Sequence, residues 1–102
     1  MKNIVVLFNL KADADPETYE IWANSTDLPI VNNLASIDKF EVFKATGLLG
    51  SDAPAPYQYV EWLCINDFDK FGVEVGADTM KKVAAEFQTF ADSPMFITLE
   101  NI

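Results

Sequence analysis

The stretch that most constrains the fold is residues 3–10, Asn-Ile-Val-Val-Leu-Phe-Asn-Leu, which the pattern predicts to be a β-strand. Side chains alternate across a strand, so one face carries Ile4, Val6, Phe8 and Leu10. The other face carries Val5 and Leu7, with Asn3 and Asn9 at its two ends. Both faces are apolar and must be buried. Because the helices of so short a chain can cover only one face of a sheet, we predict that a second copy covers the other and that Asn9 points into the resulting cavity.

Length and charge narrow the class of protein. The 102 residues, half of them hydrophobic, predict a single compact α+β domain spanning residues 1–102. The formal charge of −9 would repel nucleic acid phosphates and an anionic membrane surface, so we expect neither as a partner. No apolar run approaches the roughly 20 residues of a membrane span, and no signal-peptide pattern is seen, so the expected location is the cytoplasm.

The chain contains no histidine and one cysteine, Cys64. The lack of histidine excludes Ser-His-Asp and Cys-His nucleophile pairs, histidine-ligated haem and the usual zinc sites. A single cysteine excludes an internal disulfide and a thiolate metal cluster, and Cys64 itself is expected to pack inside a strand. We therefore expect no metal and no cofactor, with any chemistry carried by carboxylates, phenols, amides, lysine or bound water.

A helix is predicted to begin after Asp15, because Asp15 is a good N-cap and Pro16 suits the first helical position. It should end between residues 25 and 27, since Pro29 disfavours helical geometry in the preceding residue. A short second turn or helix is then expected through residue 34. The next elements are predicted as a strand over 40–45, a loop over 47–56 and a strand over 57–65. Two helices should follow, one capped by Asp67 and ended by Gly76, the other capped by Asp78 or Thr79 and broken by Pro94. The last predicted element is a strand over 95–99.

The order β-α-β-β-α-β is that of the ferredoxin-like motif, with a four-stranded antiparallel sheet. The first and third strands are the most apolar, so we expect them at the centre of the sheet. The long loop over residues 47–56 is of a length that is usually functional in compact domains.

Two carboxylates are candidate catalytic residues. Asp27, before Pro29, is either a capping or turn carboxylate or a proton acceptor whose pKa is raised by apolar neighbours such as Trp22. Glu61 lies within a largely apolar strand, where it is either paired with Lys44 on the neighbouring strand or acts as a catalytic acid.

Four further side chains are candidates for binding a ligand. Trp22, Tyr59 and Trp62 would provide flat contact surfaces, although a tyrosine in such a strand is more often a core aromatic with a solvated hydroxyl. Asn9 either satisfies loop backbone or binds a substrate carbonyl.

Once these elements are placed, the chain resembles dimeric α/β-barrel proteins. Residues 15–31 are similar to the EthD-like branch, in which an aromatic-rich helix leads into His-x-Pro, and Asp27 stands at the position of that histidine. A resemblance over nearly the whole chain is to the REDY-like family, and most of all to its HapK-like members. It is carried by Val-Val-Leu-Phe-Asn-Leu-Lys, Thr-Asp-Leu-Pro, Ala-Thr-Gly-Leu-Leu-Gly, Pro-Tyr-Gln-Tyr-Val-Glu and Phe-x-x-Phe-Ala-Asp-x-Pro.

This resemblance implies a homodimer with a role in the biosynthesis of prodigiosin, a red tripyrrole antibiotic pigment, in making or handling its bipyrrole half. Three functions are consistent with it. In the first, Asp27 and Glu61 accept pyrrole N–H groups or move protons of a bound intermediate. The second is a non-catalytic carrier or accessory protein for a pathway enzyme. The third, a cofactor-free monooxygenase, is less favoured in a chain without histidine. Whether the protein is an enzyme stays open at this point.

Overall fold

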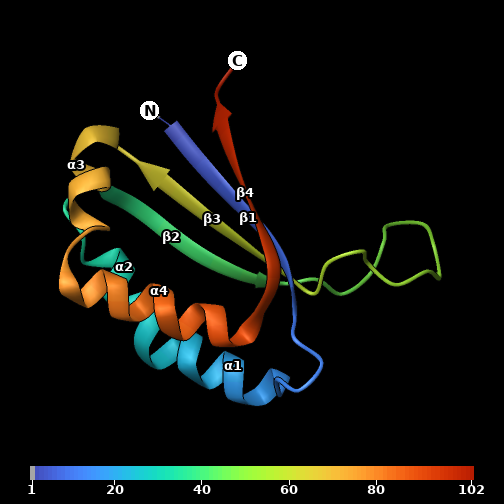
Figure 1. Ribbon diagram of the computed structural model, residues 1–102. Coiled ribbons are helices and arrows are strands. Elements are labelled where there is room, and N and C mark those ends of the chain that lie inside the picture. Colours follow the sequence, from blue (N-terminus) through green and yellow to red (C-terminus); the bar gives the residue numbers. More distant parts are fainter. Residues whose placement is uncertain (1) are drawn as a thin grey trace.

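A computed structural model describes residues 2–102, and the strand that is apolar on both faces lies inside its sheet (Figure 1). Strand β1 (Lys2–Leu10) pairs on one side with β3 (Tyr59–Ile65) and on the other with β4 (Ala91–Glu100). The fourth strand, β2 (Ile37–Lys44), pairs with β3. The sheet is antiparallel throughout with the order β2-β3-β1-β4, so the predicted ferredoxin-like α+β fold is confirmed, and so is the central place of the first and third strands.

The helices lie together against one face of this sheet (Figure 1). They are α1 (Pro16–Trp22), the π-helical turn η1 (Ala23–Asp27), α2 (Leu28–Asn32), α3 (Phe68–Glu74) and α4 (Asp78–Phe90). Beneath them the even-numbered side chains of β1 from Ile4 to Leu10 are buried, and Val6 and Phe8 are fully so. None of the helices in residues 2–102 has the length and apolar character needed to cross a membrane.

The first helix does not end before Asp27, which corrects the prediction based on Pro29. The chain stays helical through η1 into α2, and Leu28 has helical torsion angles, φ −58° and ψ −50°. Its N–H donates to the carbonyl of Ala23, five residues back, so the widened turn carries the helix up to Pro29. Pro29 then lies in the first turn of α2, where a missing N–H costs least.

The last helix also differs from the prediction at both ends. Its N-cap is Ala77, with Asp78 already helical, and it ends at Phe90 rather than near Pro94. Ala91 is extended because it pairs with Leu10, so strand pairing prevails over a helical pattern that continues in the sequence. By contrast, the predicted caps of α1 and α3 are confirmed: Asp15 accepts a hydrogen bond from the Thr18 N–H and Asp67 accepts one from the Lys70 N–H.

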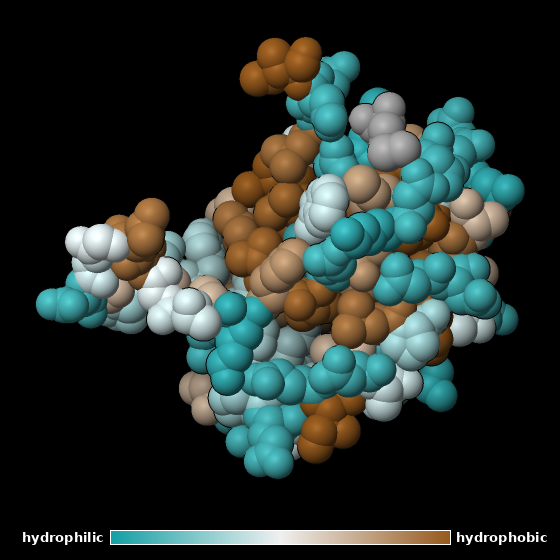
Figure 2. All heavy atoms as spheres, turned by 180° about the vertical axis from the view of Figure 1, so that it is seen from behind, coloured by the Kyte–Doolittle hydropathy of each residue, from teal (hydrophilic) through white to brown (hydrophobic). Residues whose placement is uncertain are grey.

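The second face of the sheet carries no helix, as expected from the shortness of the chain. We call it the open face. Its apolar side chains, which come from all four strands, are Val5, Leu7, Phe43, Val60, Trp62, Met95, Ile97 and Leu99. Several are far more exposed than is usual for their type, Met95 to 47% and Leu99 to 43%. Figure 2 shows apolar side chains gathered on this side of the molecule. The open face is therefore bare apolar surface within a single chain.

The helix-covered core predicts a large effect of Phe8. Its ring is fully buried and lies 5.6 Å from the Tyr19 ring, 5.6 Å from Tyr59 and 5.0 Å from Phe87, centroid to centroid. Phe8→Ala should lower the free energy of unfolding by about 3–5 kcal/mol through lost burial and an unfilled cavity, measured by urea denaturation. Phe68→Ala, at a ring that is 40% exposed, is the matched control and should cost less than half as much. Equal losses in the two variants would contradict this account of the core.

Candidate functional site

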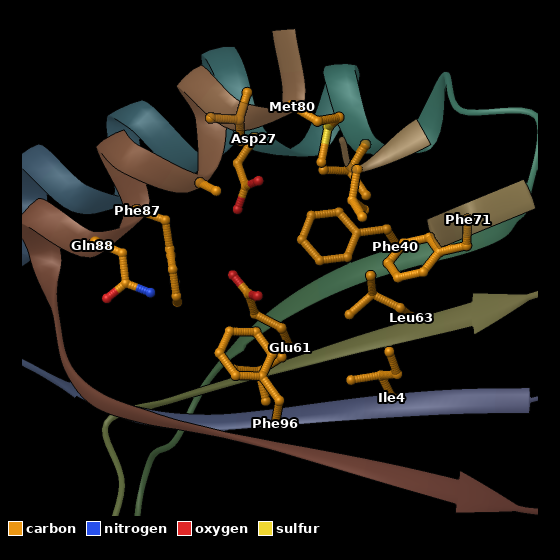
Figure 3. A pocket seen from close by; sticks show the side chains of 15 residues that line it. Ile4, Asp27, Phe40, Glu61, Leu63, Phe71, Met80, Phe87, Gln88 and Phe96 are labelled. Carbon is orange, nitrogen blue, oxygen red and sulfur yellow. The ribbon is translucent and has the colours of Figure 1, made fainter. Parts of the chain in front are cut away.

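A cavity of about 290 Å³ lies between the helix-covered face of the sheet and the helices (Figure 3). Its lining is almost entirely apolar, with Asp27, Glu61 and Gln88 as the polar exceptions. The other lining residues are Ile4, Val6, Val31, Phe40, Leu63, Phe71, Val75, Met80, Val83, Ala84, Phe87 and Phe96. Apolar walls with a few converging polar groups are typical of small-molecule sites.

Strand β3 places Glu61 in this cavity. Its odd-numbered side chains face the helices and are buried, and Glu61 sits between Val6 on β1 and Val42 on β2. Of the two alternatives for Glu61, the pairing with Lys44 is wrong, because Lys44 lies opposite Tyr59, two positions further along the sheet. The Lys44 Nζ is instead 3.4 Å from the Glu20 Oε2. Within residues 2–102, the other ion pair joins Lys39 and Glu41, so neither of the two pairs reaches Glu61.

The π-helical turn η1 places Asp27 opposite. Tyr19, Ala23, Asp27 and Val31, at intervals of four residues, are all buried. In a regular α-helix such residues would drift around the axis, because four residues exceed one turn of 3.6. The wider η1 turn offsets this drift and keeps all four side chains on the sheet side. The Asp27 side chain makes no capping hydrogen bond to α2, so the capping alternative does not describe it.

The two carboxylates point toward each other across the cavity, as Figure 3 shows. Asp27 is 4% exposed and Glu61 is 6% exposed. Burial raises the pKa of Asp27 to about 6, from 3.8, and an interaction with Glu61 partly offsets that rise. Burial, and then the nearby charge of Asp27, raise the pKa of Glu61 well above its ordinary value. The two carboxyl groups therefore titrate as a coupled pair, in which ionised Asp27 favours the protonated form of Glu61.

Tyr19, which is not among the residues predicted for the site, completes its polar part. Its hydroxyl donates to the Glu61 Oε2 at 3.5 Å. Burial and the charges of Glu61 and Asp27 raise the pKa of Tyr19, so the phenol stays a neutral donor. The four-residue spacing of Tyr19, Ala23 and Asp27 is the signal that could have linked it to the site, but it required knowledge of the η1 turn.

The predicted binding residues lie elsewhere. Trp22 packs on Tyr19 and Phe90, and its Nε1 donates to the Glu86 Oε1 at 3.1 Å. The Tyr59 hydroxyl donates to the Glu20 Oε2 at 2.7 Å and lines a smaller groove beside α1. Neither residue lines the cavity that contains the carboxylates.

Asn9 and Trp62 belong to the opposite face of the sheet, so they do not line the cavity that contains Asp27 and Glu61. The Trp62 Nε1 donates to the Asn3 Oδ1 at 3.2 Å. Asn9 donates from Nδ2 to the Pro56 carbonyl and accepts at Oδ1 from the Gln58 N–H. Of the two alternatives for Asn9, its contacts match the one in which it satisfies loop backbone. A one-residue shift along a strand changes the face, so these side chains and Glu61 point in opposite directions.

The site can bind a group that donates hydrogen bonds or carries positive charge, through ionised Asp27. It can also deliver a proton from Glu61 and take one up at Asp27, because both groups line the same cavity and their pKa values lie above the ordinary range. In residues 2–102, no group of three Cys, Asp or Glu side chains is arranged to hold a metal ion.

The raised pKa of Asp27 predicts a pH dependence of stability. Between pH 3.8 and about 6 the folded state binds more protons at Asp27 than the unfolded chain does. The stabilising contribution of protonated Asp27 is therefore fully present below pH 4 and is lost as the pH rises through 6. Asp27→Asn should remove that loss, and its free energy of unfolding should exceed the wild-type value by roughly 1–3 kcal/mol at pH 8. Urea denaturation at pH 4.5 and 8 measures the difference. Asp13→Asn, at an exposed turn, should follow the wild type, and the same behaviour in Asp27→Asn would contradict the assignment.

Comparison with solved structures supports the fold and the relationship. HapK from Hahella chejuensis is 25% identical, with the match covering 100% of this chain and 93% of that one, at a TM-score of 0.82. A dimeric protein of unknown function and ferredoxin-like fold from Bacteroides fragilis is 16% identical over 98% of this chain and 95% of that one, at 0.68. An EthD family protein from Bacillus halodurans is 14% identical over 100% and 99%, at 0.73. At such identities the last two show the shared fold alone.

No curated protein matches the chain in sequence. The family described as "REDY-like protein HapK", however, matches it from residue 2 to residue 102. That match spans all of the chain that the structure describes, and it agrees with the structural likeness to HapK. The chain therefore belongs to the HapK family of REDY-like proteins.

Proposed function

We propose that this chain is a homodimeric protein of small-molecule biosynthesis that binds a bipyrrole intermediate of a prodigiosin-type pathway and transforms it by proton transfer at Asp27 and Glu61. The pathway rests on the REDY-like resemblance and on membership of the HapK family. The chemistry rests on one observation: two buried carboxylates face each other in an apolar cavity, and neither takes part in the ion pairs seen in residues 2–102.

That observation favours a functional role because the arrangement is costly for stability. Buried carboxylates normally have a cation or several donors as partners, whereas here the Tyr19 hydroxyl at Glu61 replaces only part of the lost hydration. Such groups with raised pKa values, inside a cavity, are characteristic of sites that move protons.

The cavity suits a flat, mainly apolar ligand with N–H donors. Its volume of about 290 Å³ is near the lower end of the range for small-molecule sites. Four phenylalanine rings, those of Phe40, Phe71, Phe87 and Phe96, contribute to the lining. Pyrrole rings would lie among these apolar surfaces and direct their N–H groups at the Asp27 carboxylate, which accepts hydrogen bonds when ionised.

In the proposed reaction Asp27 is the base and Glu61 the acid. Asp27 removes a proton from the bound heteroaromatic, Glu61 returns its proton to another atom of the same ligand, and the pair regains its starting state when the proton passes from Asp27 to Glu61. Tyr19, through its hydrogen bond to the Glu61 Oε2, orients that carboxyl group. The net change is an isomerisation, so atoms and charge balance without a co-reactant.

The test is turnover of candidate bipyrrole intermediates by purified variants. Asp27→Asn and Glu61→Gln should each reduce the single-turnover rate by about 10²–10⁴-fold, because each removes one proton-transfer group. Glu20→Gln is the matched control, since Glu20 bonds to Tyr59 outside the cavity and its loss should leave the rate within a few-fold. Normal turnover in Asp27→Asn would refute the mechanism, and tight binding without conversion by the wild type would identify a carrier instead.

The homodimer in this proposal is supported by the open face and by the dimeric relative of the same fold. A β-sheet face on which apolar side chains from all four strands are exposed or half-buried is typical of an interface. If it buried about 800 Å² on each partner, the contact would be of standard size for a stable complex.

Sedimentation at micromolar concentration should therefore give twice the 11.4 kDa mass of one chain. The double variant Met95→Asp, Leu99→Asp, which places charges at exposed positions of the open face, should sediment as a folded monomer. Val73→Asp, at a position 77% exposed on the helix side, is the control and should remain dimeric. A monomeric wild type would contradict the dimer directly.

A further inference from the structure

The longest loop of the chain, residues 45–58 between β2 and β3, extends away from the body of the molecule, and we call it the arm (Figure 1). Two leucines occupy its tip. Leu49 is fully exposed and Leu48 is 44% exposed, whereas leucine is normally among the most buried residues. None of the residues that line the cavity comes from the arm, so it does not cover the site of its own chain.

The arm is anchored at its base by hydrogen bonds from both sides. The Ala45 N–H donates to the Gln58 carbonyl at 2.8 Å, and the Gln58 side chain accepts from the Leu10 N–H at 2.6 Å. Asn9 adds two more bonds, one to Pro56 and one from Gln58. The side chain predicted to bind substrate thus fixes the base of the arm and hence the direction in which it leaves the sheet.

The tip itself is a tight turn. The Ser51 N–H donates to the Leu48 carbonyl at 3.2 Å, and Gly50 has a φ of +74°, a conformation that other residues rarely adopt. The turn includes both leucines, and Figure 2 shows apolar side chains on the arm where it projects from the body of the molecule. An ordered loop that presents apolar side chains to water in this way is suited to contact another molecule.

We infer that the arm binds a second copy of this chain, with the tip leucines packed against the partner subunit. The inference rests on the homodimer of the proposed function and identifies a second part of its interface. Continuity supports it: Phe43, an open-face residue that is 45% exposed, precedes the base of the arm by two positions. Apolar surface therefore runs from the open face towards the arm.

The distribution of charge also favours a second copy of the chain as the molecule that the arm contacts. Each chain carries a formal charge of −9, so two copies repel each other unless their contact surfaces are nearly free of charge. The arm has a single charged residue, Asp52, among its 14 positions. On the open face, Lys39 and Glu41 form an ion pair with Nζ and Oε1 2.6 Å apart, so their opposite charges add little to the repulsion between two copies. In a two-fold dimer both arms would make the same contact.

The test compares two double variants by sedimentation equilibrium. Leu48→Ser, Leu49→Ser removes the apolar tip and should raise the dimer dissociation constant by at least about tenfold, because each dimer loses two buried tips. Ile21→Ser, Val73→Ser is the matched control, at helix-side positions 61% and 77% exposed, and should leave the constant unchanged. Circular dichroism checks that both remain folded, which is expected because these side chains are largely exposed.

Hydrogen exchange of the full-length wild type gives the second readout. Amides of residues 47–51 should be protected at concentrations above the dissociation constant and exchange faster on dilution below it. An unchanged dissociation constant in the tip variant, together with exchange in the arm that is independent of concentration, would overturn the inference while leaving the homodimer intact. A wild type that is monomeric at all concentrations would instead overturn the homodimer and the arm contact together.

Discussion

The rest of this structure depends on burying a central strand that is apolar on both faces. In β1, Val6 and Phe8 are fully buried under the helices, while the intervening Val5 and Leu7 lie on the open face with only neighbouring strands beside them. The hydrophobic effect acts on both sets of side chains, but the helices of one chain satisfy only the first. The fold is therefore complete on the helix side and unfinished on the other, which is the physical reason to expect association.

The alternation of side chains along the strands separates the cavity from the open face. On β3, Glu61 points into the cavity and the next residue, Trp62, points to the open face, where it binds Asn3. The residues that line the cavity and those of the open face can consequently be changed independently, since neighbouring side chains along a strand do not share an environment. The base of the arm is held from the open-face side, because Asn9 lies on that side of β1.

The carboxylate pair shows how burial can raise the pKa of acidic side chains in a protein without histidine. Burial raises the pKa of Asp27 to about 6, into the range that histidine usually occupies, and the charge of Asp27 helps to raise that of Glu61. Both groups sit beside a core in which the rings of Phe8, Tyr19 and Tyr59 contact one another. A single neutral donor, the Tyr19 hydroxyl, restrains Glu61 without neutralising Asp27.

The sequence by itself determined the fold class, the strand order, the caps at Asp15 and Asp67, and the two carboxylates as the residues to examine. These follow from local patterns of period 2 or 3.6 and from residue types that are unusual in their setting. Only the tertiary structure decided that Asp27 faces Glu61, that Lys44 pairs with Glu20, and that Tyr19 rather than Trp22 or Tyr59 contacts the site. The reason is that a π-helical turn and the registers of β2, β3 and β4 set these contacts, and both depend on packing between segments distant in the chain.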